Sequence, residues 1–245
     1  MNLIQMSFYV GQGTSGKMAY EIDNRYMLDM IKLYPERFVG TAIVDPLGAD
    51  PGQAMRDLFP RGVRAFRIHP AYSKLPPARW LEPKGCAAMF ATAARTGQAL
   101  SCLIGPDGFA EIARMCREFP ETPVIIDHLG RIGAGPDGAI HDADVDALCA
   151  LAKNSKVFVK VGAFYALGKK KPPYLDLGPL VRRVVAAFGS NRCMWESDCP
   201  FQVVRDRYSD SLALIRDQLD FLTRDDRDWL LIRTAERVLF RTAKQ

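Results

Sequence analysis

The sequence predicts an α/β protein built from repeated strand–helix units, and three observations support this class. Short runs rich in Val, Ile and Phe alternate with longer amphipathic or Ala-rich stretches to the end of the chain. The short runs are apolar throughout, which is typical of parallel strands that helices bury on both faces. The length of 245 residues is close to the roughly 250 of an α/β barrel. This pattern alone does not choose between a closed barrel and an open doubly wound sheet.

Seven strands and eight helices are predicted along the chain. The strands are expected at residues 3–9, 38–44, 63–69, 99–104, 123–128, 157–161 and 193–197. The helices are expected at residues 22–34, 50–58, 83–96, 107–119, 142–153, 176–188, 207–222 and 225–240. Asp142, Asp176 and Thr223 are candidate N-caps, and Asp226 after Thr223 has the spacing of a capping box. No linker interrupts the pattern, so a single domain over residues 1–245 is predicted.

Composition and charge narrow the class of protein. The chain is 48% hydrophobic and 25% charged, which excludes disordered and fibrous classes. The six cysteines are isolated, no run approaches the roughly 18 apolar residues of a membrane span, and no secretory signal is evident, so a cytoplasmic protein is expected. The net charge of +5 favours a small anionic partner. Basic and acidic residues are interleaved, and neither nucleic acid nor membrane is expected as a partner.

A glycine motif near the N-terminus raises one alternative. Gly11, Gly13 and Gly16 match the G-x-G-x-x-G pattern of dinucleotide-binding folds. The acidic residue that should close the second strand is not clear, because Asp45 precedes Pro46 and a polar loop that indicate a plain turn. The match is therefore weak evidence for nucleotide binding.

Two of the three histidines end predicted strands in the same way. His69 closes FRIH and His128 closes VIIDH, and side chains there point into the crevice at the carboxyl ends of parallel strands. A histidine at the core edge, bonded to backbone, is the alternative for both. Asp127 and Arg131 beside His128 favour a functional role for it, because an arginine fork suits a carboxylate ligand. His141, in a Gly-rich polar loop, is expected to face solvent.

Two further charged residues lie on the last predicted strands. Asp198 closes the apolar run CMWES, where a carboxylate could bind a metal or take a proton from water. A helix-capping role is less natural, because Pro200 follows and no helical pattern begins before residue 207. Lys160 lies amid apolar residues in VFVKVG, and it either points into the mouth of the sheet or extends to solvent at an edge.

Four stretches resemble the amidohydrolase-2 family of TIM-barrel hydrolases, in the same order and spacing. They are DNRYMLDMIKLYPERFVGTAIVDP, VRAFRIHP, PVIIDHLGR and RCMWESDCPF, and the resemblance covers residues 20 to 241. It is nearest the branch of 2-pyrone-4,6-dicarboxylate lactonases and sugar lactonases. The resemblance implies a (β/α)8 TIM-barrel-like fold and hydrolysis of a lactone or related carbonyl in a small carboxylated substrate.

The resemblance also implies roles for individual residues. Asp198 would activate the hydrolytic water, His128 would polarise the carbonyl or contact a metal, and Arg131 would hold a substrate carboxylate. Arg67, His69 and Lys160 complete the predicted substrate-binding set. A divalent metal, Zn or Mn, would have His128 and Asp198 among its ligands, and a site with no cofactor is the alternative.

The chain departs from the family pattern at several positions. The family's first strand carries His-x-His, but no histidine precedes residue 69 here. The run at 3–9 resembles the family's second strand, so a barrel that lacks the first strand is expected. Glu196 stands where Gly is usual, Cys199 where Trp is usual, and Gly162–Ala163 where Ser-Gly is usual. Three functions therefore stay open: a lactone hydrolase, a decarboxylase or hydratase of the same superfamily, and a catalytically silent or truncated barrel.

Overall fold

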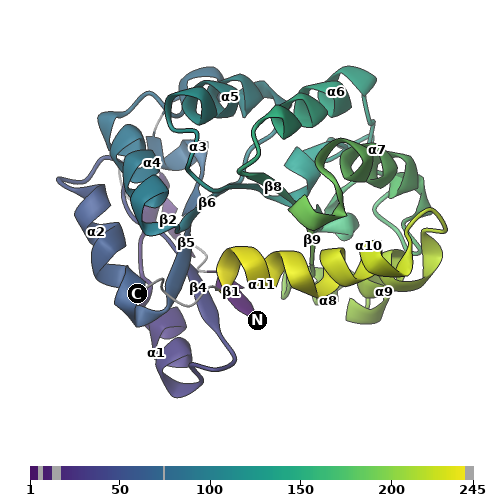
Figure 1. The fold of residues 1–245 in the computed structure, drawn as a ribbon, viewed down its shortest axis with the longest axis horizontal. Helices are drawn as coiled ribbons and strands as arrows, with labels where there is room; N and C mark the ends of the chain where they lie inside the picture. Colours follow the sequence, from purple (N-terminus) through teal and green to yellow (C-terminus); the bar gives the residue numbers. More distant parts are fainter. Residues whose placement is uncertain (5–7, 13–17, 74, 241–245) are drawn as a thin grey trace.

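A seven-stranded parallel sheet forms the centre of the molecule. The computed structural model describes residues 1–4, 8–12, 18–73 and 75–240. The sheet order is β1-β4-β5-β6-β7-β8-β9, and every neighbouring pair is parallel. The strands are β1 (Asn2–Ile4), β4 (Val39–Ala42), β5 (Val63–Ile68), β6 (Ala99–Cys102), β7 (Val124–Ile126), β8 (Val157–Gly162) and β9 (Cys193–Glu196). The sheet curls with helices around its outside (Figure 1), which confirms the predicted TIM-barrel-like class.

The predicted first strand is only partly correct. Its described beginning is β1, whereas Phe8–Gln12 forms β2, which pairs antiparallel with β3 (Met18–Glu21) in a separate two-stranded sheet. The run at 3–9 therefore does not form one strand of the main sheet. Of the candidate nucleotide motif, Gly11 lies in β2, while Gly13 and Gly16 lie outside the described residues.

The helices follow the predicted order, with the largest changes near the C-terminus. They are α1 (Arg25–Leu33), α2 (Pro51–Leu58), α3 (Pro70–Ser73), α4 (Lys84–Thr96), α5 (Phe109–Glu118), α6 (Asp142–Ala150), α7 (Gly178–Phe188), α8 (Phe201–Arg205), α9 (Tyr208–Ala213), α10 (Arg224–Asp228) and α11 (Thr234–Leu239). Two π-helical turns, Leu214–Gln218 and Trp229–Arg233, interrupt the last two predicted helices. The Thr223–Asp226 capping box is confirmed. Within the described residues, no helix combines the length and apolar character needed to cross a membrane.

The two faces of the sheet bury different side chains. The outer face packs against the helices and contributes residues such as Phe66, Leu100 and Val159 to the larger core. The inner face carries a smaller apolar layer closed by Val238 and Leu239 of α11. Its strand members are Val39, Ala65, Ala99, Ile125, Phe158 and Met194.

A polar layer lies directly above this apolar layer. Side chains two positions apart on a strand share a face, so each inner apolar residue predicts a second inner residue toward the carboxyl end. On, or directly after, six consecutive strands this second residue is polar or charged. It is Thr41 on β4, followed by the five residues of the polar layer, Arg67, Ser101, Asp127, Lys160 and Glu196. Four of the five are classed as buried, and the Glu196 side chain is 10% exposed. The polar layer therefore packs directly against the apolar layer of the inner face.

The described sheet is open between β1 and β9. In the described residues, β1 pairs with β4 and β9 pairs with β8, and no pairing joins β1 to β9. Helix α11 lies beneath this opening (Figure 1), where Val238 and Leu239 pack with Val39 and Met194 from its two sides. The opening leaves room for a cavity beside the polar layer.

The turns at the carboxyl ends of β7, β8 and β9 share an uncommon backbone conformation. The dihedral φ is positive at His128, Ala163 and Asp198, each just beyond its strand. After His128 it remains positive through Leu129, Gly130 and Arg131. Left-handed conformations cost roughly 1–2 kcal/mol per non-glycine residue, and such strain often occurs at functional sites.

Gly130 is expected to tolerate alanine less well than Gly97. Both have positive φ, but a Cβ at Gly97 meets nothing within 4 Å, whereas one at Gly130 lies 2.3 Å from Phe109 Cζ. We expect Gly97→Ala to lower the free energy of unfolding by about 1 kcal/mol from backbone strain. Gly130→Ala adds overpacking and should cost about 1–3 kcal/mol more. Urea unfolding checks this, and equal losses in the two variants would contradict the packing argument.

Candidate active site

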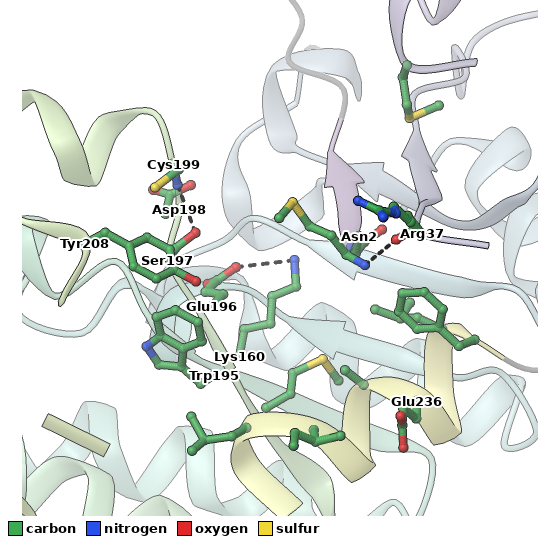
Figure 2. A pocket seen from close by; sticks show the side chains of 18 of the residues that line it. Asn2, Arg37, Lys160, Trp195, Glu196, Ser197, Asp198, Cys199, Tyr208 and Glu236 are labelled. Atoms are coloured by element: carbon green, nitrogen blue, oxygen red, sulfur yellow. Dashed lines mark hydrogen bonds and ion pairs between the residues drawn. The ribbon is translucent and has the colours of Figure 1, made fainter. Parts of the chain in front are cut away.

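A cavity of about 850 Å³ lies between β1 and β9, beside the polar layer. Figure 2 shows Lys160 pointing across it toward Glu196, with Asp198 close by and Asn2 on the opposite side. Trp195, Tyr208, Met27, Ile232 and Leu239 supply apolar parts of the lining. Lys160, Glu196 and Asp198 thus lie close together beside apolar lining, as in many small-molecule sites, while Arg37 and Glu236 line other parts of the cavity.

Asp127 is the buried centre of the polar layer. Its side chain has no exposed surface, and the Ser101 hydroxyl contacts both carboxylate oxygens, at 2.8 and 2.9 Å. Arg67 Nη2 lies 3.1 Å from Oδ2, and Lys160 Nζ lies 2.8 Å from Oδ1. Burial by itself raises the pKa of Asp127, but the charges of Lys160 and Arg67 outweigh it and hold the pKa below its usual range.

Lys160 links this centre to Glu196, and Glu196 links it to His128. Lys160 Nζ lies 3.4 Å from Glu196 Oε2, and Glu196 Oε1 lies 2.5 Å from His128 Nδ1. The backbone N–H of His128 donates to the same Oε1 at 3.2 Å. Lys160 therefore points into the mouth of the sheet rather than to solvent, since its side chain is 4% exposed.

Asp198 lies where the sequence predicts, at the end of β9 and in the wall of the cavity. The Tyr165 hydroxyl donates to Asp198 Oδ2 at 2.6 Å, and His128 Nε2 lies 3.9 Å from Asp198 Oδ1. Burial, followed by the hydrogen bond to Asp198, raises the pKa of Tyr165, which keeps the phenol a donor at neutral pH. Sequence reasoning missed Tyr165, because no local pattern separates it from neighbouring core aromatics.

His69 and Arg131 occupy the edge of the site. The backbone N–H of Ala71 donates to His69 Nδ1 at 3.1 Å, so the backbone-bonded interpretation describes His69. Burial and the charges of Arg131 and Arg67 lower the pKa of His69, which indicates a neutral ring. Arg131 is exposed, and neither His69, His128 nor Arg131 is part of the cavity lining. His141 is exposed, as expected.

The described residues alone do not fit a divalent metal. A catalytic site normally supplies three or more protein ligands, and no suitable group of three His, Cys, Asp or Glu residues occurs in the part of the chain that is described. His128 Nδ1 already contacts Glu196, and the ammonium group of Lys160 lies between two carboxylates. A further cation at this point would meet Lys160 and Arg67.

The chain belongs to the amidohydrolase family, whose profile matches residues 12–241. It is 26% identical over 196 residues to an L-fucono-1,5-lactonase from Burkholderia ambifaria, covering 77% of this chain and 64% of that protein. It is 25% identical over 179 residues to a 4-sulfomuconolactone hydrolase from Rhizobium radiobacter, covering 73% and 57%. The chain thus spans less than two thirds of the length of either relative.

Solved structures share the fold. A probable 2-pyrone-4,6-dicarboxylic acid hydrolase from Acinetobacter baumannii, with citric acid bound, aligns with a TM-score of 0.76 at 21% identity, covering 98% of this chain and 82% of that one. An amidohydrolase from Burkholderia multivorans with bound zinc aligns over the same shares, with a TM-score of 0.79 at 15% identity. A manganese-bound 5-carboxyvanillate decarboxylase from Novosphingobium aromaticivorans gives 0.61 at 15% identity, covering 89% and 68%.

Replacing Lys160 by Met should destabilise the protein strongly, because it removes the buried cation that Asp127 and Glu196 share and leaves Arg67 and His128 as their remaining partners. Breaking a buried pair from one side typically costs about 3–5 kcal/mol. Lys156→Met is the matched control, because Lys156 precedes the same strand but is 40% exposed, with Glu121 3.6 Å away. Its cost should stay below about 0.5 kcal/mol. Unfolding in urea measures both, and equal midpoints would refute a structural role for the buried charge.

Proposed function

We propose that this protein is a hydrolase that opens a lactone, or cleaves a related carbonyl, in a small anionic substrate. The observation that carries the proposal is the arrangement around Asp198. Its carboxylate lies in the cavity wall, held at Oδ2 by Tyr165, while Oδ1 lies 3.9 Å from His128 Nε2. A base and a hydrogen-bond donor are therefore close enough to act on one carbonyl and its attacking water.

The reaction uses these two groups in sequence. Asp198 accepts a proton from water as the water oxygen forms a bond to the carbonyl carbon. The carbonyl oxygen gains negative charge, which the Nε2–H of His128 stabilises by a hydrogen bond. When the intermediate collapses, the ring C–O bond breaks and the leaving oxygen takes the proton from Asp198. One lactone and one water yield one hydroxy acid, and the enzyme groups return to their initial states.

The buried cations give the site its preference for anions. Arg67 and Lys160 line the cavity, and the buried Arg67 Nε has no hydrogen-bond partner among the described residues. A substrate carboxylate could accept a bond from this nitrogen. The L-fucono-1,5-lactonase and the 4-sulfomuconolactone hydrolase are both named for lactone substrates, which supports a related substrate class. Arg131 and His69 would contact only a substrate that reaches the edge of the site.

A decarboxylase is the second candidate, and the fold neighbour that acts on 5-carboxyvanillate is the observation behind it. The two functions differ in their products. Ring opening gives a hydroxy acid and no gas, whereas decarboxylation releases carbon dioxide. Assays of both products on lactone acids and aromatic carboxylic acids separate them. Carbon dioxide release without ring opening would reject the hydrolase, and no product from either class would favour a catalytically silent barrel.

Asp198→Asn should lower kcat for ring opening by about 10²- to 10⁴-fold, because the amide cannot accept the proton of water. The far-UV circular dichroism spectrum should stay unchanged. Asp206→Asn is the matched control, since Asp206 also accepts a hydrogen bond from a tyrosine, Tyr174, at 2.8 Å, yet does not line the cavity. Full turnover by Asp198→Asn would reject Asp198 as the base.

A further inference from the structure

Glu196, which the sequence did not mark as a site residue, contacts both His128 and Lys160. One carboxylate oxygen contacts both the ring Nδ1 and the backbone N–H of His128, at 2.5 and 3.2 Å. The other oxygen faces Lys160 Nζ at 3.4 Å, an ion pair visible in Figure 2. The side chain is only 10% exposed, so these contacts are made largely out of water. Glu196 therefore joins the buried ion pairs to the imidazole.

The neighbouring strand is shaped to receive this side chain. Gly162 on β8 is in register with Glu196 on β9. A Cβ at position 162 would lie 2.4 Å from Glu196 Cγ and 2.2 Å from its backbone oxygen. The Glu196 side chain therefore occupies the space that a Cβ at position 162 would need. The packing against Gly162 therefore fixes the position of the Glu196 side chain.

A carboxylate bound to one imidazole nitrogen fixes what the other nitrogen can do. It sets the orientation of the ring and requires a proton on the bound nitrogen. In His128 the bound nitrogen is Nδ1, so Nε2 is left to face Asp198. If the ring is also protonated at Nε2, it presents a directed N–H donor to a carbonyl that approaches Asp198.

We propose that Glu196 is a positioning residue, which holds the His128 ring through Nδ1 so that Nε2 faces Asp198 and a substrate carbonyl bound there. The Nε2–H of the ring would then donate a hydrogen bond to the developing oxyanion. This inference deepens the proposed hydrolase function and rests on it.

The charges around His128 support a cationic ring. Burial lowers the pKa of His128, but the carboxylates of Glu196, Asp127 and Asp198 outweigh it, and the pKa lies above its usual value. Lys160 and Arg67 oppose this effect, yet each is paired with a carboxylate of the same layer. With His128 protonated, the three cations Lys160, Arg67 and His128 lie among the carboxylates of Asp127, Glu196 and Asp198.

Nuclear magnetic resonance tests, without any substrate, whether the Glu196 carboxylate raises the pKa of His128. The chain has three histidines, so ¹⁵N-labelled imidazoles can be titrated individually, with His128→Gln to assign the signal. Glu196→Gln should lower the pKa of His128 by about one unit or more. Glu236→Gln is the matched control, because Glu236 is an exposed carboxylate on α11 that lines the same cavity as Glu196 but lies away from it (Figure 2). An unchanged His128 titration in folded Glu196→Gln would overturn the proposal.

Steady-state kinetics tests whether the contact between Glu196 and His128 contributes to ring opening. Glu196→Gln should lower kcat for ring opening by about 10- to 100-fold with a smaller change in KM. The alkaline limb of the pH–rate profile should move to lower pH, because an imidazolium without its carboxylate loses the proton more easily. A merely structural role would lower activity without moving this limb, and that result would contradict the proposal.

A second variant covers the case in which Glu196→Gln fails to fold. Glu196→Asp keeps a negative charge beside Lys160 but is one methylene too short for the Nδ1 contact. It should lower the His128 pKa in part and shift the Nδ1 resonance, and wild-type values for both would overturn the proposal. The two proposals also fail separately: a wild-type protein that opens no lactone rejects the hydrolase, while the titrations still decide whether Glu196 controls His128.

Discussion

The buried carboxylate of Asp127 is the constraint on which the inner face of the sheet depends. A charge without solvent exposure costs several kcal/mol unless it is paired and hydrogen-bonded, so its partners are tightly constrained. Those partners come from three other strands: Arg67 from β5, Ser101 from β6 and Lys160 from β8. The ion pairs therefore place four strand ends at defined positions relative to one another. Glu196 then extends the same set of contacts to β9.

The candidate catalytic groups occupy the ends of these strands, where the backbone turns sharply. His128 and Asp198 both have positive φ, at the ends of β7 and β9. The apolar layer beneath, closed by α11, supports the polar layer. A turn in a strained conformation, packed above an apolar layer, restricts the orientation of its side chain. Attack of water on a carbonyl requires the reacting groups to be oriented in this way.

The family relationship identifies the fold of this chain, whereas the reaction depends on the side chains of the site. The solved neighbours include a hydrolase and a decarboxylase on the same fold, so the fold does not decide between these reactions. The reaction depends on the side chains that a particular chain places on the fold, and in this chain Glu196 contacts Nδ1 of His128. Gly162 lies in register with Glu196, and the absence of a Cβ at position 162 leaves the space that the Glu196 side chain occupies beside His128.

The sequence by itself determined the strand–helix order and most element positions, because burial periodicity is a local property of the chain. The predicted strands at 38–44 and 63–69 contain β4 and β5, and the capping box at Thr223 is present. The sequence also determined that His128 and Asp198 end strands, since parallel strands bring their carboxyl ends together.

Only the tertiary structure decided what those side chains contact. Tyr165 lies 33 residues from Asp198 and Glu196 lies 68 residues from His128, so no local spacing reveals either hydrogen bond. The same applies to Arg131, which stays at the exposed edge although its motif suggested a place in the site. The sequence pattern also did not predict the two π-helical turns or the antiparallel pairing of β2 with β3. Such contacts join segments that are distant in the sequence, and they form only once the strands have assembled side by side into the sheet.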